Sequence, residues 1–142
     1  MDVGYIRKRV RRTIAEARRA SAERRTQVAA AEQDGARVLS DVVAPLFTTL
    51  AAALKAEGYR FQVLTPAGAV RLAAESSPED HIEVSLDTQR EPPGLVARVS
   101  RTWGRRVLID ETILREAADI GSLTAEDLLE FSLAQLAPFV GR

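Results

Sequence analysis

The sequence contains no cysteine and a single histidine, His81, in 142 residues. Without cysteine the chain forms no disulfide and offers neither a thiol nucleophile nor a thiolate-bound zinc site. One imidazole excludes metal sites built on paired histidines. Phosphate-binding glycine loops are also missing, since Gly94, Gly104 and Gly121 stand alone, and no serine lies in a nucleophile-elbow motif. We therefore expect a protein that is not an enzyme, with no catalytic residue, no cofactor and no metal.

Long apolar runs are missing as well. The most apolar stretch, Val42–Leu54, spans thirteen residues and contains Pro45, which is too short to cross a bilayer. Arg and Glu interrupt residues 7–25, so this segment does not read as a signal peptide. We expect a cytoplasmic protein and no membrane partner.

The net charge is zero, because 20 Lys and Arg balance 20 Asp and Glu. Residues 1–25 nevertheless hold nine cations and three anions, a net charge of +6, and residues 26–142 carry the compensating −6. Eighteen of the cations are Arg, and together with the abundant Ala this bias is typical of a high-GC bacterial genome. The clustering of the cations, rather than their type, therefore indicates a basic arm.

Helix formers dominate from Val3 to about Glu57, and the apolar positions follow an eleven-residue repeat better than a heptad. Such a repeat keeps one apolar stripe along a nearly straight helix. A continuous helix of this length reaches roughly 80 Å at 1.5 Å per residue, too long for a small domain to cover. We therefore expect a homodimer formed through the helix, in the manner of a coiled coil. The predicted helix-packing and dimer positions are Val3, Ile6, Val10, Ile14, Ala17, Val28, Leu39, Val43, Phe47, Leu50 and Leu54.

Two places favour a break in this helix. Asp34-Gly35 is a turn-prone pair, and Pro45 cannot donate to the helical ladder. A break would give two helices, one near residues 4–33 and one near 37–57, with Gly58 as the C-terminal cap.

After Gly58 the apolar period changes from 3.6 to 2. Short alternating runs separated by Pro- and Gly-containing turns predict an antiparallel meander of four or five strands within residues 59–110, with a hairpin tip at Trp103-Gly104. Thr124 and Asp127 predict the start of a last helix over about 124–138, which Pro138 limits. Residues 111–120 are compatible with either a short helix or irregular structure, and their pattern does not distinguish the two.

The expected fold class is therefore α+β: a long N-terminal helix, the meander, and a C-terminal helix packed on the sheet. The expected organisation is a basic helical arm over residues 1–35 and a globular domain over residues 36–142. This combination resembles secretion chaperones and coiled-coil adaptor heads in architecture only, since no motif carries the likeness.

The arm is the first candidate for binding an anionic partner. Its cations suit nucleic-acid phosphate or an acidic protein, whereas its apolar face is narrow for lipid. The candidate residues are Arg7, Lys8, Arg9, Arg11, Arg12, Arg18 and Arg19. Weaker candidates surround the hairpin tip, where basic and aromatic residues interleave as in single-strand binders. They are Arg101, Trp103, Arg105 and Arg106.

The leading hypothesis is a non-catalytic dimeric adaptor, scaffold or chaperone-like protein-interaction module that self-associates through its long helix and presents its sheet domain to a protein partner. The second hypothesis is a nucleic-acid-binding accessory protein that uses the basic arm. The third is an enzyme with an acidic site near residues 79–87, which would require those acids to converge in a pocket.

Overall fold

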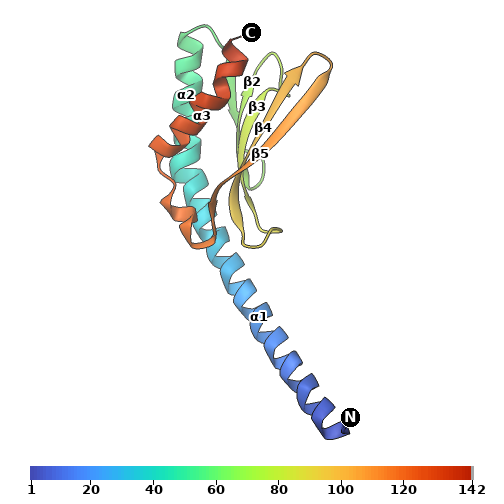
Figure 1. Ribbon diagram of the computed structural model, residues 1–142. Coiled ribbons are helices and arrows are strands. Elements are labelled where there is room, and N and C mark those ends of the chain that lie inside the picture. Colours follow the sequence, from blue (N-terminus) through green and yellow to red (C-terminus); the bar gives the residue numbers. More distant parts are fainter. Residues whose placement is uncertain (142) are drawn as a thin grey trace.

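The fold is α+β, as the periodicity predicts: one long helix, a five-stranded antiparallel sheet and a C-terminal helix (Figure 1). The computed structural model describes residues 1–141. The long helix is continuous over 54 residues, Val3–Ala56. It consists of α1 (Val3–Val38), a π-helical segment η1 (Leu39–Val43) and α2 (Ala44–Ala56).

The helix break predicted at Asp34-Gly35 is wrong. At Pro45 the helix does not break but widens locally. Gly35 lies within α1, where hydrogen bonding continues on both sides of it. At Pro45 the helix widens instead of ending, since η1 directly precedes it and the Ala44 N–H donates to the Leu39 carbonyl, five residues back. This wider turn accommodates a proline, which has no N–H and whose ring would clash with the carbonyl four residues earlier.

The helix ends where Gly58 predicts. Gly58 adopts a φ of 93°, in the left-handed region that glycine enters without strain. The Tyr59 N–H donates to the Leu54 carbonyl and the Gly58 N–H to that of Lys55. This pair of bonds is the Schellman motif, which satisfies carbonyls that the last helical turn leaves open.

The sheet is a simple meander in the order β1-β2-β3-β4-β5, with every neighbouring pair antiparallel. Its last strand continues to Glu116, so the predicted limit of the strands at residue 110 is wrong. The alternation there is obscured by the consecutive apolar residues 107–109 and by a register shift opposite Leu95/Val96. The strands are β1 (Phe61–Leu64), β2 (Ala69–Ala74), β3 (His81–Asp87), β4 (Gly94–Trp103) and β5 (Arg106–Glu116).

The helices cover one face of this sheet (Figure 1). Val43, Phe47 and Leu50 of the long helix join the inward-facing strand residues in one buried cluster. The fully buried members include Leu72, Ile82 and Val84, which alternate with half-buried residues along β2 and β3, and Leu95 and Ala97 of β4. The sheet therefore has one face toward the helices and one toward solvent.

The C-terminal helix α3 (Ala125–Val140) begins as predicted and ends later than predicted. The Thr124 hydroxyl accepts from the Asp127 N–H and the Asp127 carboxylate accepts from the Thr124 N–H, which completes a capping box. Pro138 lies inside the last turn instead of ending the helix. A short 3-10 helix, η2 (Ala117–Ser122), links β5 to α3.

The long helix makes a close contact with the sheet between α1 and β3. Gly35 is buried there, and a Cβ placed on it would lie 3.1 Å from a Leu86 methyl carbon. The missing side chain therefore lets the helix approach the sheet closely.

Replacing Gly35 by Leu should destabilise the fold, although helix propensity alone predicts the opposite. Overpacking costs about 1–3 kcal/mol, and removing a helical glycine recovers at most about 1 kcal/mol. We expect a net loss in the free energy of unfolding, measured by urea titration. The adjacent exposed position provides the control, Ala36→Leu, which should leave stability nearly unchanged. A more stable Gly35→Leu protein would contradict the close approach.

Candidate functional site

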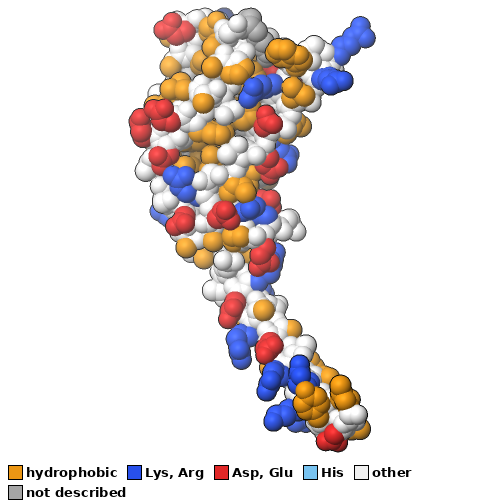
Figure 2. All heavy atoms as spheres, viewed as in Figure 1, with side chains coloured by type: hydrophobic (Ala, Val, Ile, Leu, Met, Phe, Trp, Pro, Cys, Tyr) orange, Lys and Arg blue, Asp and Glu red, His pale blue; other side chains and the backbone are white. Residues whose placement is uncertain are grey.

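The N-terminal arm, which we define as residues 1–23, is exposed over its whole length. It projects beyond the body as a free helix (Figure 1), and basic and apolar side chains gather near its tip (Figure 2). The Asp2 side chain caps its start by accepting from the Gly4 N–H. Within the described chain, nothing packs on this part of the helix.

The arm nevertheless carries an apolar stripe made of Val3, Ile6, Val10 and Ile14, whose exposed fractions are 76%, 45%, 49% and 45%. Their spacing of three and four residues places them on one helical face. The same face continues into the body, where Gly35 and Leu39 are buried. The stripe is therefore an extension of the core-facing side of the helix beyond the end of the core.

The positions predicted for helix packing fall into two main groups, one buried in the core and one exposed to solvent. Leu39, Val43, Phe47 and Leu50 are buried in the chain's own core, and Leu54 packs against it. These five positions do not form a dimer surface, because the sheet already covers them. Val28 is half-buried, whereas the remaining positions are open to solvent: Val3, Ile6, Val10, Ile14 and Ala17.

The candidate cations of the arm also face solvent. Arg9 lies over the ring of Tyr5, 5.8 Å from its centroid, and donates to its hydroxyl at 2.8 Å. No ion pair within residues 1–141 involves any of the seven candidates. The first cation of the helix to pair with the body is Arg24, which contacts Glu91. The positive charge of the arm is thus not neutralised by the acidic body.

The hairpin candidates fall into different environments. Arg101 points toward the helices and donates to the Gln135 amide oxygen of α3 at 3.0 Å, so it has a structural partner. Arg105 and Arg106 are exposed at the tip, and Trp103 is 74% exposed. The tip lies away from the helices (Figure 1). Trp103, Arg105 and Arg106 therefore remain together on an accessible surface.

The exposure of β5 at the edge of the sheet was not predicted from the sequence, although a strand at residues 107–109 was. From Arg106 to Ile113 every residue is exposed, on both faces of the strand. In the part of the chain that the structure describes, β4 is the only strand paired with β5. Val107, Leu108 and Ile109 are 49%, 48% and 59% exposed. Three consecutive apolar residues indicate a strand buried on both faces, and only the topology shows that this strand lies at the edge.

The solvent face of the sheet carries a row of alternating charges across four strands. The cross-strand partners run Arg71, Glu83, Arg98, Glu111. Arg71 Nε donates to the Glu83 carboxylate at 2.7 Å, and Arg98 lies 3.8 Å from that of Glu111. Opposite charges on directly opposed residues stabilise an antiparallel pair modestly, so these groups serve the sheet.

The acids between residues 79 and 87 do not converge. The buried Asp80 carboxylate accepts from the Thr102 N–H at 2.7 Å, Glu83 pairs with Arg71, and Asp87 accepts from the Gln89 N–H. His81 lies 3.0 Å from the Pro78 carbonyl through Nδ1. Each group has its own local partner, and no three His, Asp or Glu side chains within residues 1–141 are grouped to hold a metal ion.

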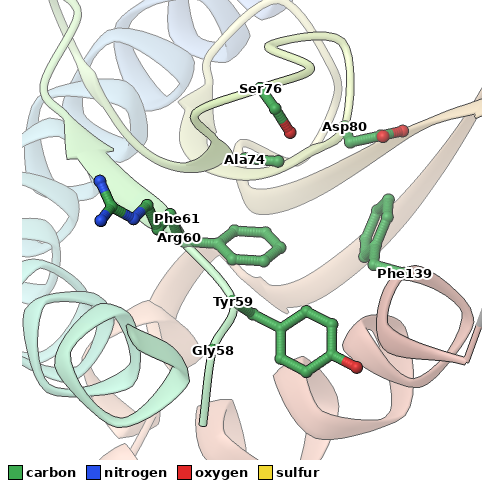
Figure 3. A pocket seen from close by; sticks show the side chains of 8 residues that line it. All are labelled: Gly58, Tyr59, Arg60, Phe61, Ala74, Ser76, Asp80 and Phe139. Atoms are coloured by element: carbon green, nitrogen blue, oxygen red, sulfur yellow. The ribbon is translucent and has the colours of Figure 1, made fainter. Parts of the chain in front are cut away.

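A small pocket of about 310 Å³ lies beside Asp80. Tyr59, Phe61 and Phe139 contribute its aromatic side, where the rings of Phe61 and Phe139 meet edge-on at 6.4 Å, and Ser76 and Asp80 lie opposite (Figure 3). The Tyr59 hydroxyl donates to the Val140 carbonyl at 3.1 Å. These contacts join the start of the sheet to the end of α3, which is a structural role.

By length and composition the helix Val3–Ala56 includes a stretch apolar enough to cross a membrane. Of that stretch, 28% is buried, including Val43 and Phe47, which are fully buried beneath the sheet. Comparison with protein-family models, curated proteins and solved structures found no match to this chain.

We expect Asp80 to act as a structural anchor. Asp80→Ala removes the acceptor of a buried backbone N–H and should lower the free energy of unfolding by about 1.5–3 kcal/mol. Asp80→Asn keeps an oxygen acceptor and should cost less, and the exposed neighbour change Glu79→Ala should cost less than about 0.5 kcal/mol. Chemical denaturation measures all three. Equal stabilities of the Asp80→Ala and wild-type proteins would contradict this role.

Proposed function

We propose that the chain is a non-catalytic protein-interaction module that self-associates through its N-terminal arm. The observation that carries this proposal is the apolar stripe of the arm, which continues the core-facing side of the helix into solvent. In proteins, most helical stability comes from packing of an apolar face. A helix that covers the stripe therefore stabilises the arm.

A second copy of the arm fits this requirement in an antiparallel arrangement. The body lies on the same side of the helix as the stripe, so a parallel pair would bring two bodies into the same space. An antiparallel pair instead sends each tip toward the body of the other copy. Charge favours this arrangement, because residues 1–25 carry +6 and the remainder carries −6.

A change of Ile14 to Asp tests the arm in the full-length protein. The buried unpaired carboxylate should weaken self-association at least tenfold, which corresponds to about 1.4 kcal/mol. Sedimentation equilibrium over a concentration series measures the effect.

The matched control is Ala15→Asp, which places the same charge on the adjacent residue, on the opposite side of the helix from Val10. It should leave the dissociation constant close to that of the wild-type protein. A mass distribution that responds equally to both variants, or to neither, would overturn self-association through the stripe.

A second candidate function is nucleic-acid binding, and one observation favours it. The seven candidate cations of the arm have no ion-pair partner within residues 1–141 and lie on a helix that nothing covers. Lys and Arg bind phosphate by displacing condensed counterions, so the affinity falls steeply with salt.

Fluorescence anisotropy with a labelled duplex tests this candidate. Binding that decreases about 10³-fold or more between 50 and 200 mM salt would support phosphate contacts by several of the seven cations. Changing Arg7, Lys8, Arg9, Arg11 and Arg12 to Ala should then abolish binding, whereas Arg60→Ala on the body should not. Absence of binding at about 50 mM salt would exclude nucleic acid as the ligand of the arm.

A further inference from the structure

The free edge of β5 has the properties of an interaction surface, independently of the arm. Within residues 1–141, β4 is the one strand that pairs with β5, and residues 106–113 are exposed on both faces. The opposite edge of the sheet is protected, because β1 is four residues long and Pro66 follows it. Native proteins usually shorten an edge strand or interrupt it with Lys or Pro. Residues 107–109 of β5 instead present Val, Leu and Ile.

The hairpin geometry identifies the backbone groups at this edge. Gly104, with a φ of 63°, and Arg105 form a two-residue turn closed by the Trp103–Arg106 pair. A closing pair of this kind is hydrogen bonded, and bonded and non-bonded pairs alternate along an antiparallel ladder. The N–H and C=O groups of Val107 and Ile109 therefore point away from β4, toward the free edge. An added strand would find them available.

The pattern Arg106-Val-Leu-Ile-Asp110 is complementary to itself when read in the opposite direction. In an antiparallel pair centred on Leu108, this leucine faces Leu108 of the second copy. Val107 faces Ile109, and Arg106 faces Asp110, each twice by symmetry. Apolar side chains thus meet apolar ones, and each basic residue meets an acidic one.

Neighbouring registers lose this match. Directly opposed side chains must project from the same face of the sheet. The two-fold axis that relates the two strands therefore lies between the two copies of a single residue. Centring the pair on Ile109 sets Leu108 against Asp110, and centring it on Asp110 sets two carboxylates against each other. Centring it on Val107 sets Arg106 against Leu108. Among these registers, only the one at Leu108 pairs both the apolar residues and the charges.

We propose that β5 binds β5 of a second copy in the antiparallel register centred on Leu108, which joins the two five-stranded sheets into one. Arg106 and Asp110 are exposed and form no ion pair within residues 1–141, so the proposed interface supplies the partners that the chain itself does not. The β4–β5 hairpin leans away from the helices (Figure 1). An interface this short is smaller than the usual 1,200–2,000 Å² and should have a dissociation constant of roughly micromolar or weaker.

Charge exchange tests the register in the full-length chain carrying Ile14→Asp, which removes the arm contact. Arg106→Asp sets two carboxylates against each other at both ends of the pair, and Asp110→Arg sets two guanidinium groups against each other there. Each single variant should weaken dimerisation at least about tenfold in sedimentation velocity. The double variant R106D/D110R restores both opposite-charge pairs and should regain the dimer. An equimolar mixture of the two single variants should also dimerise, because each contributes the charge that the other lacks.

Leu108→Lys and Leu133→Lys form a matched pair of controls. The two leucines are 48% and 50% exposed, but only Leu108 lies on the edge strand, so only its replacement should dissociate the dimer. Far-UV circular dichroism should show unchanged folding for every variant. A monomeric Ile14→Asp parent at about 200 µM, single variants that dimerise normally, or a double variant that stays monomeric would each overturn the proposal.

The same proteins separate this interface from that of the arm. With both surfaces in use, the wild-type chain should form species larger than a dimer, and either Ile14→Asp or Arg106→Asp alone should reduce them to dimers. If the arm does not self-associate, Ile14→Asp will leave the mass unchanged, while Arg106→Asp will still convert dimers to monomers. If the edge is not used, Arg106→Asp will have no effect in either background, which overturns the proposal.

Discussion

The packing of the long helix on one face of the sheet is the contact on which the rest of the structure depends. Val43 and Phe47 are fully buried beneath the strands, and Gly35 lets the helix approach β3. This contact holds the helix along only part of its length, since the sheet ends before the helix does. The arm is therefore an extension of a helix whose base is fixed by the core, and its direction follows from that base.

The same packing determines which surfaces remain open. A meander covered on one side by helices necessarily has two edges and one solvent face. The solvent face is occupied by the row from Arg71 to Glu111, and the β1 edge is short. Two surfaces that keep several neighbouring exposed apolar groups are the stripe of the arm and the edge of β5. Both are elongated and lie at opposite sides of the body, so two interactions can occur on one chain without competition.

The sequence predicted much of this fold because the relevant signals are local. The eleven-residue repeat, the left-handed position of Gly58 and the Thr124 capping box each depend on a few neighbouring residues. The predictions that are wrong concern helix breaks, helix ends and strand ends, beginning with the break expected at Asp34-Gly35. Pro45 did not break the helix and Pro138 did not end one, because packing of the surrounding apolar residues outweighs the loss of one backbone hydrogen bond. The end of β5 was predicted too early because the pairing of β4 with β5 shifts its register at Leu95/Val96.

By itself the sequence determined the element types, the apolar stripe of the helix and the separation of charge into a basic arm and an acidic remainder. The tertiary structure decided which parts of these patterns are available to a partner. Leu50 and Ile6 occupy equivalent positions of the eleven-residue repeat, yet Leu50 is buried and Ile6 is exposed. Likewise, Val107, Leu108 and Ile109 resemble a buried strand, and only the strand order places them at an edge. Exposure depends on what other elements cover, which is a non-local property that no short segment encodes.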